Sequence, residues 1–157
     1  MQLSPASRTR WVLVAVAAIV AASAVLVWWC TRPDVAQRHL ADIRVQGFGR
    51  IADAPVARGS GDYGPNAGAI FLGPFVADLP PLVTADIAVK PVVPPIITAE
   101  DHSSTVAGAT WPDDCALSVS RITPPAPDPA WNLTERQAGD LAAGTLALLR
   151  IIVTCNG

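Results

Sequence analysis

The longest run of hydrophobic positions in the chain covers residues 11–29, WVLVAVAAIVAASAVLVWW. The run contains no charged residue, and Ser23 is its only hydroxyl-bearing residue. As an α-helix with a rise of about 1.5 Å per residue, a segment of this length spans roughly 28 Å, which matches the hydrocarbon core of a bilayer. The pattern therefore predicts one N-terminal transmembrane helix over residues 11–29 that contacts the lipid bilayer.

Tryptophans stand at both ends of this run, because Trp11 opens it and Trp28 and Trp29 close it. Indole side chains concentrate at membrane–water interfaces, since they join a large apolar surface to a hydrogen-bond donor. We therefore predict that these three residues lie at the membrane interfaces and that the segment is a permanent signal anchor. Ala17 and Ala21 lie four residues apart within it, a spacing that permits a weak homodimer through close helix packing.

Two other fates of the N-terminal segment stay open. The small residues around Ala24 suit a signal peptidase, and cleavage there would release the downstream chain as a secreted protein. Cys30 directly follows the run and offers a thiol for acylation, although the bulky Trp29 before it departs from the lipoprotein pattern. The tryptophans at both ends favour the anchor over either alternative.

Downstream of this segment, the hydrophobic pattern has the period of β-strands. The predicted strands cover residues 43–51, 69–79, 82–90, 115–122 and 145–155. Strict alternation over residues 82–90 predicts a strand with one buried face, whereas residues 145–155 are apolar on both faces and therefore central. The run over residues 69–79 is broken by Gly73 and Pro74, which predicts two short strands or one kinked edge strand.

Prolines and polar residues predict the segments between these strands. The proline-containing residues 91–97 are expected to run along a sheet edge, and residues 53–68 and 100–114 are expected to be loops. Asp34 is suited to cap a short helix that ends near Leu40.

A stronger helix signal lies near the end of the chain. Thr134 and Gln137 have the spacing of a capping box, and Gly144 is suited to end a helix. Together with the strands, this helix predicts a small, mainly-β, antiparallel, sandwich-like domain with one short helix near residues 135–143. The predicted organisation is a cytoplasmic tail over residues 1–10, a transmembrane signal anchor over 11–29, a juxtamembrane connector over 30–42 and an exported β-rich domain over 43–157.

The cysteines bear on the topology. Cys115 begins one predicted strand and Cys155 ends another, so both lie at the same end of the sheet if these strands are antiparallel neighbours. We predict a disulfide between them, with Trp111 and Trp131 either packed against it or exposed as anchors for a partner. Because disulfides persist outside the cytosol, the bridge places the N-terminus in the cytoplasm and residues 31–157 outside.

The net charge excludes one class of partner. Beyond residue 30, nine Lys and Arg face thirteen Asp and Glu, so this part carries a net charge of −4. Nucleic acids and anionic lipid surfaces are bound through clustered positive charge. We therefore expect no nucleic-acid partner.

Two histidines are the candidates for catalysis or metal binding. His39 lies in the connector and is expected to be solvated. His102 lies in an acidic segment, with Asp113 and Asp114 about ten residues later. No second histidine at helical spacing and no cysteine pair at zinc-site spacing accompanies it. The sequence therefore predicts no catalytic residue, metal or cofactor.

Taken together, these features predict a single-pass envelope protein of bacterial type, located in the cell membrane. Its extracytoplasmic domain is expected to act as a binding or accessory module of a membrane complex, with a protein partner in the membrane or envelope, and not as an enzyme. Two alternatives remain: a membrane-tethered hydrolase or metal-binding enzyme centred on the His102 acidic loop, and a secreted protein produced by cleavage near Ala24.

Overall fold

The computed structural model describes residues 18–25, 28, 33–54, 63–98, 102–123 and 131–156. They belong to two compact units, Met1–Pro33 and Asp34–Gly157. In the first unit, residues 18–25 are helical, and the large side chains of Ile19, Val20 and Val25 are exposed.

The predicted anchor falls mainly on residues that the structure does not describe. Trp11, Ala17, Trp29 and Cys30 lie outside the described residues, whereas Trp28 is described and exposed. Within the described part of the chain, no helix combines the length and the apolarity needed to cross a membrane. The transmembrane helix over residues 11–29 therefore stays a prediction from the sequence.

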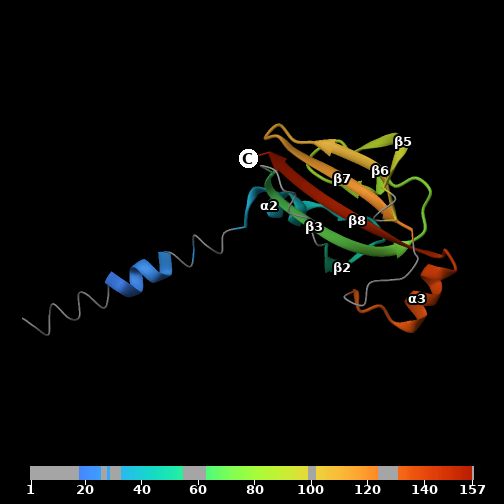
Figure 1. Cartoon of the computed structure of the whole chain (residues 1–157), viewed down its shortest axis with the longest axis horizontal. Helices are drawn as coiled ribbons and strands as arrows, with labels where there is room; N and C mark the ends of the chain where they lie inside the picture. The colour runs from blue at the N-terminus through green and yellow to red at the C-terminus, as the bar shows by residue number, and fades with distance from the viewer. Residues whose placement is uncertain are drawn as a thin grey trace, which may run out of the picture. The chain divides into compact units, whose positions relative to one another are not determined.

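The second unit is built on a six-stranded antiparallel sheet in the order β2-β3-β8-β7-β6-β5 (Figure 1). These strands are β2 Gly49–Asp53, β3 Tyr63–Pro74, β5 Lys90–Thr98, β6 Ser103–Thr110, β7 Cys115–Ile122 and β8 Leu146–Asn156. The remaining elements are helix α2 Val35–Asp42, strand β1 Arg44–Val45, the 3-10 helix η1 Pro80–Leu82, strand β4 Val83–Thr84 and helix α3 Glu135–Ala142. The predicted central position of the last strand is confirmed, since β8 pairs with β3 on one side and β7 on the other.

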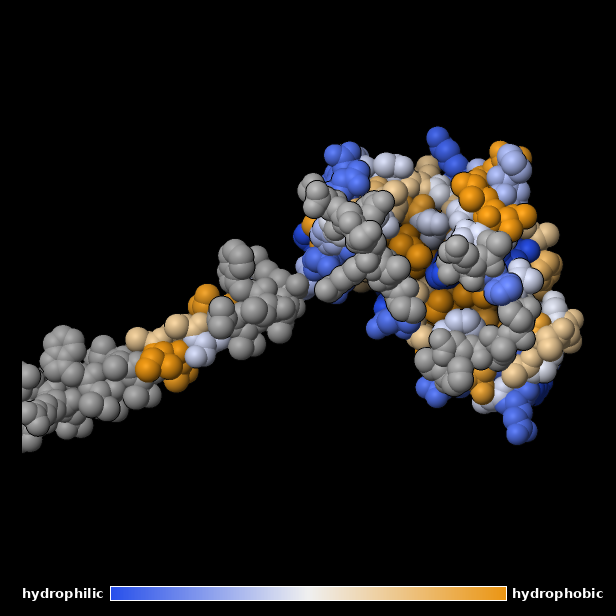
Figure 2. All heavy atoms as spheres, in the orientation of Figure 1, coloured by the Kyte–Doolittle hydropathy of each residue, from blue (hydrophilic) through white to orange (hydrophobic). Residues whose placement is uncertain are grey.

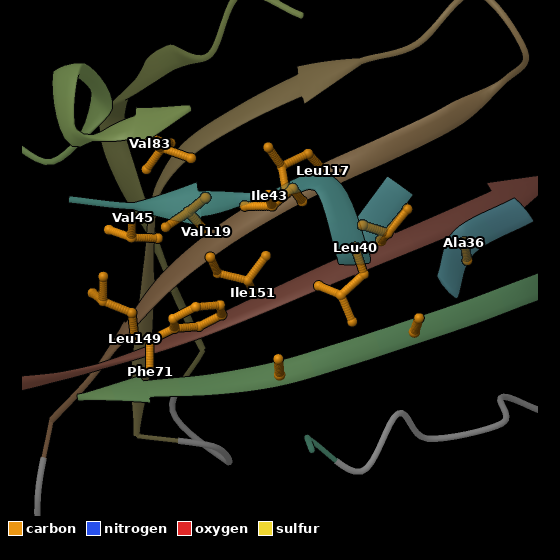
Figure 3. Close-up of a cluster of buried hydrophobic side chains, with 14 of the residues drawn as sticks. Ala36, Leu40, Ile43, Val45, Phe71, Val83, Leu117, Val119, Leu149 and Ile151 are labelled. Atoms are coloured by element: carbon orange, nitrogen blue, oxygen red, sulfur yellow. The ribbon is translucent and has the colours of Figure 1, made fainter. Parts of the chain in front are cut away.

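One face of the large sheet carries the main core. Helix α2 contacts β3 and β8 and buries Ala36 and Leu40, which lie four residues apart and so share one side of the helix. Strands β1 and β4 pair into a separate ribbon that adds further apolar side chains. In Figure 3 these side chains meet those of the sheet; the labelled residues are Ala36, Leu40, Ile43, Val45, Phe71, Val83, Leu117, Val119, Leu149 and Ile151.

A smaller core lies on the opposite face of β3 and β8, because neighbouring residues of a strand point to opposite faces. Its buried members are Ala54, Ile70, Leu72, Leu141 and Leu148, and Trp131 packs against them. Leu141 comes from α3, whose predicted capping box between Thr134 and Gln137 is confirmed. The helix ends before Gly144, which has a positive φ of 73° that glycine adopts readily.

The mainly-β, antiparallel prediction is confirmed, but the sandwich is not. In the described residues, the second layer consists of α2 and a ribbon of two-residue strands, where a sandwich would have a second large sheet. The reason is local: Asp34 and Gln37 form a complete capping box, so the connector forms a helix that covers the sheet.

Within the alternating segment 82–90, only Val83, Thr84 and Lys90 lie in strands: the first two form β4, and Lys90 begins β5. Val83 is buried, and Ala85, Ile87 and Val89 pack against the main core. The alternation therefore correctly indicated which side faces the core. It did not indicate whether a neighbouring strand pairs with the segment, because side-chain period and ladder hydrogen bonds are separate properties.

Two expected loops contain strands. Residues 103–110, predicted as part of a loop, form β6, and β3 begins at Tyr63, inside the other predicted loop. Strand β6 lacks the alternating large side chains that would have predicted it. Its residues are small because β5 and β7 approach it closely: a Cβ at Gly108 would lie 3.1 Å from the carbonyl oxygen of Leu117. The predicted kinked edge over 69–79 is also wrong, since β3 is one continuous inner strand up to Pro74.

Candidate functional site

The predicted disulfide is confirmed. Cys115 and Cys155 are register partners at one end of the β7–β8 pair, and their sulfur atoms lie 2.01 Å apart. Both residues are buried in the main core, together with Trp111. The Trp111 amide donates a hydrogen bond to the Cys115 carbonyl at 2.8 Å, so this tryptophan closes the β6–β7 turn beside the bridge. Trp131, in contrast, packs with α3 in the smaller core.

A polar group lies next to the disulfide. The His39 ring stacks on Trp111 with a centroid distance of 4.2 Å, and its Nε2 lies 2.9 Å from Oδ2 of Asp113. The indole N–H of Trp111 donates to the carboxylate of Asp86. We call His39, Trp111, Asp113 and the two disulfide cysteines the His39 cluster; it joins α2 to the β6–β7 turn and to the end of β8.

The electrostatics of the His39 cluster follow from these contacts. The hydrogen bond from His39 lowers the pKa of the Asp113 carboxyl from its ordinary value, and backbone hydrogen bonds from Asp113 and Cys115 act in the same direction. The expectation of a solvated His39 is wrong, since its side chain is only 17% exposed. Its position three residues after Ala36 on a helix gives a sequence signal for this placement, because residues at that spacing share a face.

The acidic loop proposed around His102 is not assembled in the described residues. His102 directly precedes β6, whereas Asp113 and Asp114 follow the other end of this strand. An eight-residue strand at about 3.4 Å per residue separates the two ends by roughly 27 Å. His102 is exposed, with a positive φ of 45°, and its carbonyl accepts a hydrogen bond from the Thr123 amide. It therefore serves as a turn residue, and Glu100 and Asp101 lie outside the described residues.

Two adjoining clefts lie between α2 and the β2 side of the sheet. One has a volume of about 300 Å³ and includes Gln37 and Asn66; the other has about 260 Å³ and includes Phe48. Arg50 lines both, and its guanidinium is paired with Asp53. These clefts offer polar contacts to a small ligand, but the residues that line them do not include a histidine, serine or cysteine for nucleophilic or acid–base chemistry.

The clearest unusual surface is the free edge of the large sheet. Strand β5 pairs only with β6 among the described strands, as the proline-rich sequence predicted. Its side chains of Val93, Ile96 and Ile97 are 83%, 60% and 79% exposed. Figure 2 shows hydrophobic atoms gathered in the region of β5, at the upper right of the view. We call these three residues the β5 patch; it wraps around the edge strand, because the neighbours Ile96 and Ile97 point to opposite faces of the sheet.

Neither a protein-family model, nor a curated protein, nor a solved structure matches this chain. Its function is therefore inferred from its own residues and their geometry. The structure brings together the predicted cysteine pair and one unexpected histidine, and it separates His102 from the later aspartates.

Proposed function

We propose that this chain is a single-pass membrane protein of a bacterial-type cell envelope, with a cytoplasmic N-terminus. Its disulfide-bonded domain acts outside the cytoplasm as a binding or accessory module of a membrane complex. The β5 patch is the observation that carries the proposal.

The anchor is supported by the sequence of residues 11–29, which is long enough for a bilayer and bounded by Trp11, Trp28 and Trp29. The location of the domain is supported by the buried Cys115–Cys155 bridge, since structural disulfides form and persist in oxidising compartments outside the cytosol.

Binding through the β5 patch is supported by its chemistry. Large aliphatic side chains grouped on one exposed strand are typical of protein interaction sites, and burying each one contributes about 1.5–3 kcal/mol. Pro91, Pro94 and Pro95 remove three backbone N–H donors from the same strand. The edge is therefore poorly suited to extension by another β-strand, so a protein partner recognises the side chains.

Crosslinked co-purification from native membranes, with a tag at the C-terminus, tests this proposal. Ile97→Asp places a charge in the β5 patch and is expected to abolish crosslinked partners. Ala116→Asp is the matched control, because it adds the same charge at an exposed position of β7. Equal recovery of partners by the two variants contradicts binding through the β5 patch.

The same preparation separates the rival functions. Intact mass of the membrane-bound protein shows whether the chain has been cut near Ala24, which a secreted protein requires. His102→Ala is expected to leave folding and complex formation unchanged, since His102 occupies an exposed turn. A membrane-tethered hydrolase centred on His102 predicts the loss of an activity in that variant instead.

A further inference from the structure

The His39 cluster contains more ligand chemistry than a structural disulfide needs. Nε2 of His39, a carboxylate oxygen of Asp113 and Sγ of Cys115 all lie within 4.8 Å of one another. Sγ of Cys155 lies outside this 4.8 Å group, but it is bonded to Sγ of Cys115 and is the nearest source of a fourth ligand atom. Two thiolates, one imidazole and one carboxylate form a donor set that suits Zn²⁺.

We propose that the dithiol form of this domain binds one zinc ion through Cys115, Cys155, His39 and Asp113, and that formation of the disulfide expels the ion. The site is thus redox-controlled: the same two sulfur atoms either bind the metal or bind each other. This inference is independent of the β5 patch and of the proposed partner.

His39 and Asp113 need only a small movement to reach the spacing of zinc ligands, whereas Cys155 must rotate toward them. In a tetrahedral site with Zn–S of about 2.3 Å and Zn–N of about 2.0 Å, neighbouring ligand atoms lie roughly 3.3–3.8 Å apart. The His39–Asp113 contact of 2.9 Å would have to widen by less than about 1 Å to reach that range. The sulfur atoms separate to a similar distance by side-chain rotation once their bond is opened.

The surrounding structure holds the ligands in place without the bridge. Strands β7 and β8 stay in register from the Cys115–Cys155 pair to the Ile122–Leu148 pair, so the cysteines remain opposite each other after reduction. The stack on Trp111 fixes the plane of the His39 ring, as outer contacts commonly do for metal ligands. Asp113, with a side chain that is 48% exposed, gives the ion a path from solvent.

The proposed cycle has three steps: reduction of the disulfide, binding of zinc, and oxidation with release of zinc. A dithiol reductant gives two electrons and two protons to the Cys115–Cys155 bond, yielding two thiols, and is itself oxidised to a disulfide. Zn²⁺ then replaces the two thiol protons, which are released to solvent, and takes the neutral imidazole of His39 and the carboxylate of Asp113 as its other ligands. Oxidation of the two thiolates to the disulfide, with transfer of two electrons to a disulfide oxidant, releases Zn²⁺.

Metal binding by the full chain in detergent micelles tests the proposal. All proteins carry Cys30→Ser, so that Cys115 and Cys155 are the only cysteines. One sample stays oxidised, and the other is reduced with dithiothreitol in urea. Anaerobic desalting then removes the dithiothreitol and the urea, and the reduced chain is refolded with Zn²⁺. Bound metal is measured with a colorimetric chelator after a second desalting step, and Co²⁺ replaces zinc in a parallel sample to reveal thiolate-to-metal charge-transfer bands.

We expect one metal ion per reduced chain, charge-transfer bands with Co²⁺, and no bound metal in the oxidised chain. His39→Gln and Asp113→Asn should each weaken zinc binding by more than the roughly 10–100-fold that loss of an outer-shell partner costs. His102→Gln is the matched control and should leave the affinity unchanged. If the reduced chain unfolds without metal, adding zinc should restore its circular dichroism, because metal binding and folding are then one process.

Three results would overturn the proposal. The first is equal zinc binding by the oxidised and reduced chains, which would exclude the cysteines as ligands. The second is a reduced chain that binds no metal, whether it stays folded or fails to refold with zinc. The third is unchanged affinity in both His39→Gln and Asp113→Asn, which would leave a two-cysteine contact and no four-ligand site.

Discussion

Replacing Cys115 and Cys155 by alanine removes the covalent link between β7 and β8. The two residues are separated by 40 positions in the chain. In the chain-entropy description, a bridge that closes a loop of that length lowers the conformational entropy of the unfolded state and raises its free energy by about 4 kcal/mol at 25 °C. The variant without the bridge loses this stabilisation. Since small domains are stable by about 5–15 kcal/mol, the bridge supplies a large share of the total.

The loss is measurable by urea unfolding of the full chain in detergent micelles, followed by tryptophan fluorescence. With a urea dependence of about 1–3 kcal/mol per molar for a small domain, the midpoint should fall by roughly 1–4 M. The single variants make the test sharper. Either Cys115→Ala or Cys155→Ala already opens the bridge, so each should cost nearly as much as the double variant, which is strong non-additivity between neighbours.

Two results would refute this reasoning. One is a double variant whose stability lies within about 1 kcal/mol of the parent protein, well below the usual contribution of a disulfide. The other is additive behaviour of the two single variants, because independent effects mean that each cysteine stabilises the domain by packing alone. A direct control is thiol labelling of the unfolded, unreduced chain, in which Cys30 should be the only reactive cysteine.

Three further predictions concern single positions. Gly73→Ala should destabilise the domain by about 1–3 kcal/mol in thermal unfolding, since its Cβ would collide with the ring of Phe48 in the β1–β2 turn. Gly49→Ala is the control and should cost much less, because its Cβ would meet nothing within 4 Å. Thr134→Ala removes the N-cap of α3 and should cost about 0.5–2 kcal/mol in the same assay; an unchanged melting temperature would contradict the cap. Asp113 has a lowered pKa in the folded state, so its bond to His39 stabilises the fold above the unfolded pKa of about 3.9 and is lost as the pH falls through the folded value. The stability difference between the parent protein and Asp113→Asn should therefore shrink in melts below about pH 4, and a constant difference from pH 6 to pH 2 would contradict it.

Local signals in the sequence predicted the elements that depend on local interactions. The capping box of Thr134 and Gln137 uses residues three positions apart, and both the cap and α3 are present. The run of β-branched residues in β8 correctly indicated a strand at the centre of the sheet. The bridge was predicted on the condition that the strands of Cys115 and Cys155 are antiparallel neighbours, and β7 and β8 meet that condition.

Elements that depend on distant neighbours were not predictable in the same way. Strand β6 consists largely of small and polar residues, and it forms because β5 and β7 supply hydrogen bonds on both sides. Conversely, residues 82–90 have the better alternation but pair only at Val83, Thr84 and Lys90. His39 was misplaced for a related reason, since its burial depends on Trp111 and Asp113, more than 70 positions away in the chain.

The place of β8 in the sheet has a consequence for how the domain is made. It is the last described strand in the chain, yet it lies between β3 and β7 and joins the two halves of the sheet (Figure 1). During synthesis, β3 can pair with β2 but lacks its other partner until residues 146–156 emerge. Such long-range pairing is slow, and it leaves the earlier strands incomplete in the meantime. The two parts of the sheet, β2–β3 and β7–β6–β5, are therefore joined only when residues 146–156 pair with both β3 and β7.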